Sequence, residues 1–132
     1  MDPFPLTVGS TALISICYQA VRLMKNSIEN VKGAKKVLIG LFNETERMRL
    51  LLEQLRALTH QLQGRNTLLL AFNDSACKET MNELKALVHQ IVGTKTVFSL
   101  QVLLNKSKAD DLLKRLRRHE EEIIVVLMSI VA

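Results

Sequence analysis

Residues 34–63 read AKKVLIGLFNETERMRLLLEQLRALTHQLQ and carry the most regular hydrophobic pattern of this chain. Two series of residues recur every seven positions, the spacing at which side chains return to one face of a helix. The series are Val31, Leu38, Thr45, Leu52 and Thr59, and Ala34, Leu41, Met48, Leu55 and Leu62. The pattern predicts one long helix over residues 34–63, which Gly64 ends.

Apolar side chains beside this seam make the hydrophobic face wider than two positions per heptad. They are Val37, Phe42, Leu51 and Leu58. A two-stranded coiled coil needs only the narrow seam, whereas a helix inside a bundle buries a wider face. We therefore expect a bundle, with the polar residues on the other faces of this helix: Glu44, Glu46, Arg47, Arg49, Glu53, Gln54 and Arg56.

The segment before it, MDPFPLTVGSTALISICYQAVRL (1–23), has no charged residue from Pro3 to Val21. Its length fits a membrane span, but polar residues recur every three or four positions and form one stripe on a helix. The stripe is Thr7, Thr11, Ser15, Gln19, Arg22, Asn26 and Glu29, opposite Leu13, Ile16, Cys17, Ala20, Leu23, Met24 and Val31. We therefore predict an amphipathic helix. A secretory signal is disfavoured, because Asp2 stands where basic residues belong.

Two further helices are predicted towards the C-terminus. One begins at Asp74 or Ser75, which suit an N-cap, and stops at Gly93. Its apolar face is Cys77, Met81, Leu84, Val88 and Ile91. Ser107 and Asp110 resemble a capping box that opens the last helix. The inner line of that helix is Ala109, Leu112, Leu116, Ile123, Leu127 and Ile130. Residues 66–72 suit a helical turn or a loop, and residues 95–106 suit a helix or a strand.

Composition agrees with helices, because five Gly, two Pro and no Trp leave few signals for the turns of a sheet protein. We predict one domain over residues 1–132, an all-α antiparallel bundle of four helices or of five. Cys17 and Cys77 lack zinc spacing and are expected to be buried thiols of a reducing compartment, the cytosol. The uncharged end, IIVVLMSIVA, is expected to be buried or covered by a following segment of a longer protein.

The sequence contains no catalytic, cofactor-binding or metal-binding motif, so we expect neither an enzyme nor a cofactor. His60, His89 and His119 fall one per predicted helix. His119, near the inner line of the last helix, is expected to be a core or boundary histidine. The formal charge of +5 suits attraction to anionic lipid or nucleic acid, or merely ordinary solubility. Nucleic acid is disfavoured, because the chain lacks stacking aromatics and a recognised reading motif.

Two basic clusters are candidate contacts for anionic lipid headgroups. The candidates are Lys32, Lys35 and Lys36 after the first helix, and Lys114, Arg115 and Arg118 in the last. The second cluster directly precedes three glutamates at 120–122. Pairing along the helix, such as Arg117 with Glu121 and Arg118 with Glu122, is the plainer explanation of that cluster.

The ordered pieces of this chain together resemble a known family. The pieces are the opening Met-Asp-Pro-Phe with its uncharged helix, LLLEQLRAL at 50–58, the Cys-x-x-x-Met-x-x-Leu spacing from Cys77, and LLKRLRRHEEEI at 112–123. In this order they resemble the HeLo-like N-terminal domain of fungal STAND (NLR-like) receptors. The resemblance covers nearly the whole chain and implies an all-α bundle followed by receptor domains in the same chain.

The resemblance also implies a function. The HeLo domain of HET-S and the four-helix bundle of mixed-lineage kinase domain-like protein are relatives that execute regulated cell death at membranes, in heterokaryon incompatibility and innate immunity. Carried over here, the helix from Leu6 to Leu23 would be exposed after oligomerisation and would permeabilise the plasma membrane, to which the cytoplasmic protein would relocate. Its candidate inserting residues are Phe4, Leu6, Val8, Leu13, Ile14 and Ile16.

Two interpretations of the first helix therefore stand side by side. It is either a releasable wall of the bundle that enters a membrane, or a fixed wall. In the second case the domain is a non-lytic interaction or oligomerisation module that relays a signal. Its partners would then be helices of other proteins or further copies of the chain, bound through the widened apolar faces.

Overall fold

The computed structural model describes residues 5–31, 33–62, 74–106 and 108–131, with side chains for 12–31, 33–58, 75–104 and 108–129. The described residues form five helices and no strand, which confirms the expected all-α fold. The helices are α1 (Pro5–Asn30), α2 (Lys35–Leu62), α3 (Asp74–Gly93), α4 (Val97–Lys106) and α5 (Ala109–Val131).

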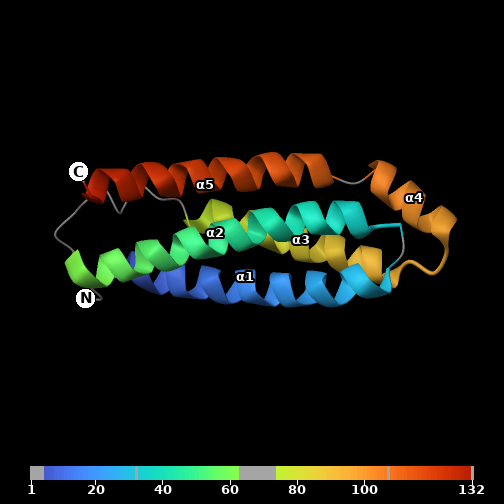
Figure 1. Ribbon diagram of the computed structural model, residues 1–132, viewed down its shortest axis with the longest axis horizontal. Coiled ribbons are helices and arrows are strands. Elements are labelled where there is room, and N and C mark those ends of the chain that lie inside the picture. Colours follow the sequence, from blue (N-terminus) through green and yellow to red (C-terminus); the bar gives the residue numbers. More distant parts are fainter. Residues whose placement is uncertain (1–4, 32, 63–73, 107, 132) are drawn as a thin grey trace.

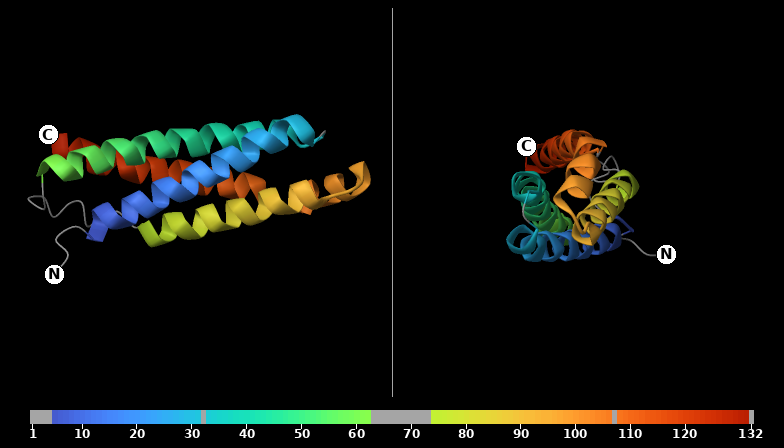
Figure 2. Two further views of the ribbon diagram at one scale, coloured as in Figure 1. Left: turned by 90° about the horizontal axis from the view of Figure 1, so that it is seen from below. Right: turned by 90° about the vertical axis from the view of Figure 1, so that its right-hand side faces the viewer.

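The four long helices lie side by side along the long axis of the molecule, and consecutive ones run in alternate directions (Figures 1 and 2). α2 packs against α1 on one side and α5 on the other, and α3 packs against the same two helices. The short helix α4 lies at the end of the molecule where α3 ends and α5 begins. The four long helices thus enclose one common core.

The heptad seam predicted over residues 34–63 is the part of α2 that faces this core. All its described members within α2 are fully buried: Leu38, Leu41, Thr45, Met48, Leu52 and Leu55. Thr45 is tolerated there because its hydroxyl donates a hydrogen bond to the Leu41 carbonyl at 2.7 Å. The side chains of Thr59 and Leu62, and Gly64 as a whole, lie outside the described residues.

The amphipathic patterns predicted for the other long helices are confirmed as well. In α1, Leu13, Cys17, Ala20 and Met24 are buried, whereas the polar stripe is exposed at Ser15, Gln19, Arg22, Asn26 and Glu29. All five predicted core residues of α3 are fully buried. Ala109, Leu112, Leu116 and Ile123 are buried in α5. Both cysteines are buried thiols, as expected.

Residues 97–106 are helical, so the strand that was an alternative for this stretch is wrong. Thr96 caps α4, because the Ser99 amide donates to Thr96 Oγ1 at 3.0 Å and the Leu100 amide donates to the Thr96 carbonyl at 3.0 Å. The undecided stretch 66–72 and the predicted cap Ser107 lie outside the described residues.

The turn between α1 and α2 depends on Gly33. Its φ of 93° lies in the left-handed region, which a residue with a Cβ adopts only with strain. A Cβ at this position would also lie 3.2 Å from Leu100 Cδ2 of α4. Gly33 therefore both reverses the chain and lets the turn approach α4 closely.

Candidate functional site

The first helix is the candidate functional element, and its apolar face is directed inward. Leu13 and Ile14 are buried and Ile16 is half-buried against the core formed with α2 and α3. Leu6 and Val8 lie within α1 with side chains outside the described residues, and Phe4 lies outside them altogether. In this structure the described candidate inserting residues thus support the fold, and they would meet lipid only after α1 left its neighbours.

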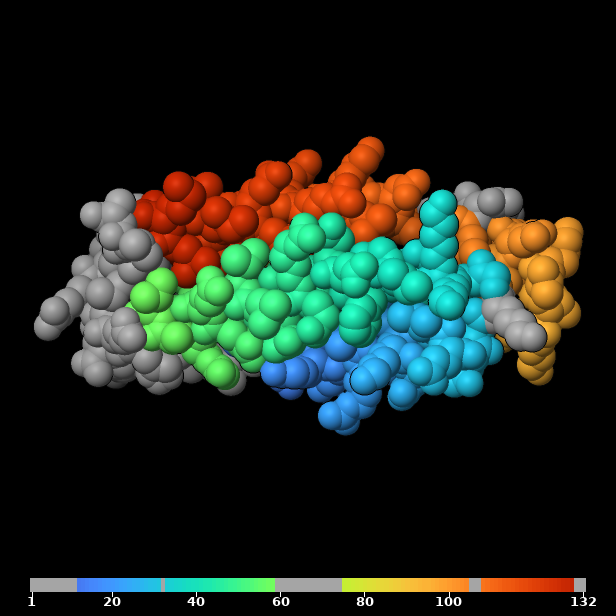
Figure 3. All heavy atoms as spheres, in the orientation of Figure 1, coloured from blue at the N-terminus to red at the C-terminus, as the bar shows by residue number. Residues whose placement is uncertain are grey.

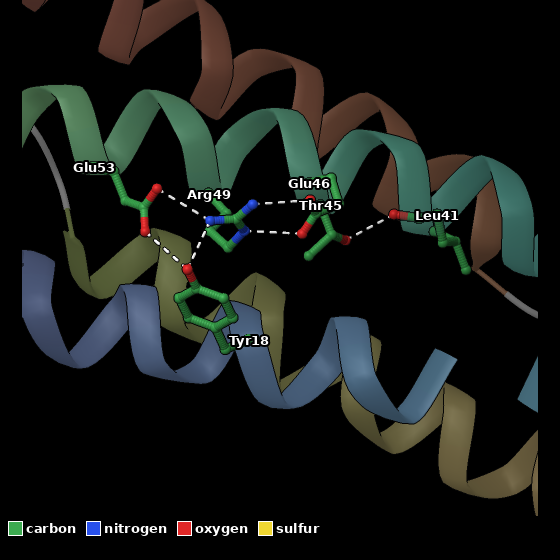
Figure 4. A network of polar contacts seen from close by, with 6 residues as sticks. All are labelled: Tyr18, Leu41, Thr45, Glu46, Arg49 and Glu53. Atoms are coloured by element: carbon green, nitrogen blue, oxygen red, sulfur yellow. Dashed lines mark hydrogen bonds and ion pairs between the residues drawn. The ribbon is translucent and has the colours of Figure 1, made fainter. Parts of the chain in front are cut away.

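A cluster of polar contacts joins α1 to α2 at the surface (Figure 4). We call Tyr18, Glu46, Arg49 and Glu53 the tyrosine cluster. The Tyr18 hydroxyl donates to Glu53 Oε1 at 3.0 Å and accepts from Arg49 Nη1 at 2.9 Å. The Arg49 guanidinium also lies over the Tyr18 ring, with Cζ 4.6 Å from the ring centroid. Tyr18 is therefore held by hydrogen bonds and by a cation–π contact.

Charge within α2 positions Arg49 for these contacts. Its Nε and Nη2 donate to the two oxygens of Glu46 at 2.8 and 2.9 Å, and its Nη1 donates to Glu53 Oε2 at 3.0 Å. The hydrogen bonds from Arg49 hold the pKa of Glu46 below its usual range, and those to Glu46 raise the pKa of Arg49. The guanidinium thus stays charged and oriented, since two carboxylates of the same helix anchor it.

A second polar contact of α1 reaches α3, where Lys85 Nζ donates to Gln19 Oε1 at 2.9 Å. Beneath these surface contacts lies Cys17, whose pKa burial raises to about 12. The thiol therefore stays protonated and unreactive at neutral pH. The attachment of α1 thus combines a buried apolar face with polar contacts to both neighbouring helices.

Replacing Tyr18 with phenylalanine is expected to weaken the attachment of α1 to α2 without creating a cavity. The change removes the hydroxyl that joins Glu53 and Arg49, so the free energy of unfolding should fall by about 0.5–1.5 kcal/mol. Hydrogen exchange should accelerate in α1 more than in α5, with Ser15→Ala as the control on the exposed stripe. Equal acceleration in all helices would show that the tyrosine cluster does not hold α1 specifically.

A pair of buried carboxyl groups lies between α2 and α5. Glu44 and Glu120, which we call the carboxyl pair, are 7% and 4% exposed. Arg117 Nε donates to Glu44 Oε1 at 3.1 Å, and Arg47 Nε lies 3.7 Å from Glu120 Oε1. Two predictions are therefore wrong: Glu44 is not on an outer face of α2, and Arg117 pairs with α2 instead of with Glu121 on its own helix.

The carboxyl pair is expected to hold a proton at neutral pH. Burial, together with the neighbouring Glu44, raises the pKa of Glu120 to about 8, whereas the hydrogen bond from Glu120 holds the pKa of Glu44 below its usual range. Oε2 of each group is buried and meets no other hydrogen-bond donor in the described part of the chain. A proton shared between the two groups supplies the missing donor, because two adjacent buried carboxylates repel each other.

His119 is the expected boundary histidine, 6% exposed and next to the carboxyl pair in sequence. Its Nε2 lies 2.8 Å from Thr80 Oγ1, and the Thr80 hydroxyl donates to the Ala76 carbonyl. We therefore assign the proton to Nε2, which donates to Thr80. Burial lowers the pKa of His119, so the ring is neutral at pH 7.

The candidate headgroup contacts do not form one site. Lys35 and Lys36 are exposed at the start of α2, and Lys114 and Arg118 are exposed on α5. Arg115 is half-buried and forms ion pairs with Glu83 of α3 and, at 3.6 Å, with Asp111. Lys32 lies outside the described residues. The structure thus separates two exposed lysines, Lys35 and Lys36, at one end from a mixed-charge surface along α5.

Sequence reasoning missed the tyrosine cluster and the carboxyl pair. The spacing of Glu46, Arg49 and Glu53 is a helical pairing pattern that predicts their contacts within α2. The contacts of Arg49 and Glu53 with Tyr18, and the contact between Glu44 and Glu120, join residues more than thirty positions apart. Only the packing of the helices brings such residues together.

Comparisons of the chain with models of protein families, with curated proteins and with solved structures found no match. Among the described residues, no three side chains of His, Cys, Asp or Glu are grouped as a metal site would require. Over the same part of the chain, no helix combines the length and the apolar character that a membrane crossing needs.

Proposed function

We propose that this domain is a HeLo-like effector module of a fungal NLR-like receptor, which permeabilises membranes in regulated cell death after its first helix is released. The observation that carries the proposal is the construction of α1. Its inner face is apolar and buried, and its sequence carries no charge from Pro5 to Val21. Such a helix enters the boundary between headgroups and acyl chains without desolvating an ionised side chain.

Release of α1 would break two sets of contacts, and the free energy needed to break them differs. The surface contacts at Tyr18 and Gln19 are exposed and exchange readily with water. The apolar contacts of Leu13, Cys17 and Met24 are fully buried, so their loss needs a compensating interface. In the proposal, two processes supply this interface. The receptor domains drive oligomerisation, and α1 becomes buried in lipid. The resemblance of the ordered sequence pieces supports the same assignment.

The proposal is tested by dye leakage from anionic liposomes. The domain is fused to a trimeric coiled coil that forces oligomerisation, and the native sequence is compared with the double variant Ala12→Glu and Ser15→Glu. Both positions are exposed in α1, so two charges enter the helix without disturbing the core. Leakage is expected to fall about ten-fold or more, because the charges oppose insertion.

Asn82→Glu on the exposed face of α3 is the control and should leak like the native protein. Two results would contradict the proposal. One is a native, oligomerised domain that leaves the vesicles intact. The other is a double variant that lyses them as fast as the native protein.

A second candidate function, a non-lytic oligomerisation module, is favoured by the last helix. Its outer face exposes apolar side chains near the C-terminal end, with Val125 62% and Met128 66% accessible. Exposed apolar surface of this kind suits contact with another helix. Sedimentation of the isolated domain distinguishes the candidates: association weakened by Val125→Ser, without vesicle leakage, would favour this module.

A further inference from the structure

One end of the molecule is built from segments that are far apart in the sequence. The turn between α1 and α2, the last turn of α3 and the short helix α4 meet there (Figures 1 and 2). Gly33 approaches Leu100 of α4, and a shallow groove runs between Val31 on one side and Val92 and Val97 on the other. In the space-filling view α4 forms the tip of this end (Figure 3).

The outer surface of this tip is apolar. Leu100 is 3% exposed and anchors α4 to the core, with Leu103 and Leu104 partly buried beside it. The cap at Thr96 fixes the first turn of α4, which leaves Val97 66% and Phe98 75% exposed. Phe98 has the largest exposed fraction among the large hydrophobic side chains that the structure describes. Water is an unfavourable environment for two such neighbours, so their exposure points to a partner.

The segments that form this end carry positive charge. Residues 30–36 and 92–109, whose described parts meet there, contain six lysines and no acidic residue. Among them, Lys35, Lys36 and Lys95 are exposed near the tip. The nearest acidic residues along the chain are Glu29 and Asp110, which are also exposed.

We infer that this end docks on the surface of an anionic bilayer while the helices stay packed. We define the end patch as Val92, Val97, Phe98, Lys35, Lys36 and Lys95. Phe98 and Val97 enter the boundary between headgroups and acyl chains, and the lysines contact lipid phosphates. A nucleic acid could contact the lysines, but it would not bury the exposed valines, so their exposure to water would remain unfavourable. The inference shares a membrane partner with the proposed function but needs no release of α1.

The test is co-sedimentation of the monomeric domain with vesicles of phosphatidylcholine and phosphatidylserine. Phe98→Ser is expected to weaken binding about ten-fold, and the double variant Lys35→Gln and Lys36→Gln about twenty-fold. Both sets of side chains are exposed, so the circular dichroism spectrum should not change. Vesicles of phosphatidylcholine alone should bind far less of the native protein.

Controls come from α2 and α5. Leu50→Ser removes an apolar side chain of α2 that is 50% exposed, and Lys114→Gln with Arg118→Gln removes from α5 the same charge as the lysine variant. Both controls should bind like the native domain. The inference is overturned if these controls weaken binding as much as the end-patch variants. It is also overturned if Phe98→Ser binds normally, or if the domain binds duplex DNA but not the vesicles.

The same vesicles separate this inference from the proposed function. A domain that binds through the end patch but never causes leakage, even when oligomerised, refutes the lytic function and leaves the docking surface standing. A domain whose leakage and binding are insensitive to Phe98→Ser refutes the docking surface and leaves the lytic function standing. Ala12→Glu with Ser15→Glu should bind normally and leak poorly if both hold.

Discussion

Replacing Ile14 with glutamate is expected to lower the free energy of unfolding by about 4 kcal/mol or more. Ile14 is 4% exposed in the core between α1 and its neighbours. Loss of a buried isoleucine alone costs about 2–5 kcal/mol, and a carboxylate placed there would be buried unless the helix moved. Unfolding in urea, followed by circular dichroism, measures the effect.

Ser15→Glu is the matched control, because it places the same side chain one residue further on, at an exposed position. It should change the free energy of unfolding by less than about 0.5 kcal/mol. Equal stability of the two variants would show that α1 does not pack with Ile14 inward. The comparison also shows why Ile14 is unsuitable for tests of membrane insertion. Glutamate at this position would detach α1 from the core and add a charge to it, so the two effects could not be separated.

A fall in stability between about pH 6.5 and pH 8 is the second expected result, and it comes from the carboxyl pair. The folded state keeps a proton on Glu120 up to about pH 8, whereas an unfolded glutamate releases it near its ordinary pKa. The unfolded state therefore binds fewer protons over this interval, and the free energy of unfolding falls as the pH rises. The loss is expected to be about 1–2 kcal/mol.

The other described groups with shifted pKa values act mainly outside this interval. His119 has a lowered pKa in the folded state, so it adds stability as the pH rises but does so below its ordinary pKa. Glu44, Glu46 and Glu83 have lowered pKa values and act at still more acidic pH. Cys17 remains protonated in the fold until about pH 12, so it lowers stability only in alkaline solution. Among the described groups, Glu120 is therefore the one expected to lower stability between pH 6.5 and pH 8, and a variant that cannot titrate isolates its part of the slope.

Glu120→Gln should remove this slope. The amide keeps the shape of the protonated carboxyl and still donates a hydrogen bond to Glu44, but it does not titrate. The variant should be more stable than the native protein by about 1–2 kcal/mol near pH 8.5. Glu121→Gln, at the exposed neighbouring position, should keep the native slope. Parallel profiles for the native protein and Glu120→Gln would show that the carboxyl pair holds no extra proton.

The helices of this protein were largely predictable, because their signal is local. The seven-residue spacing from Leu38 to Leu52 and the polar stripe of α1 both reflect the helical repeat. A helix that buries one face shows this repeat whatever element it packs against. The helix ends at Gly93 and near Asp74 follow from backbone preferences of single residues. The stretch that became α4 was ambiguous, because its β-branched residues suit a strand although the sequence offers no second strand to pair with it.

The site was much less predictable. In the sequence, Glu44 and Arg117 look like other charged residues that have a residue of opposite charge three or four positions away on the same helix. They differ because α5 covers that part of α2 and removes water from Glu44. The exposure of Phe98 was hidden in the same way, because in a short apolar segment the sequence does not tell which side chains the core will leave outside.

The sequence by itself therefore determined where the helices lie and which face of each is apolar, since both follow from spacing along one chain. The tertiary structure alone decided which polar residues meet across helices, which carboxyl groups are buried away from water, and which apolar side chains reach the surface. These outcomes depend on distances between elements and on the dielectric environment that packing creates, and neither quantity is encoded in a local pattern.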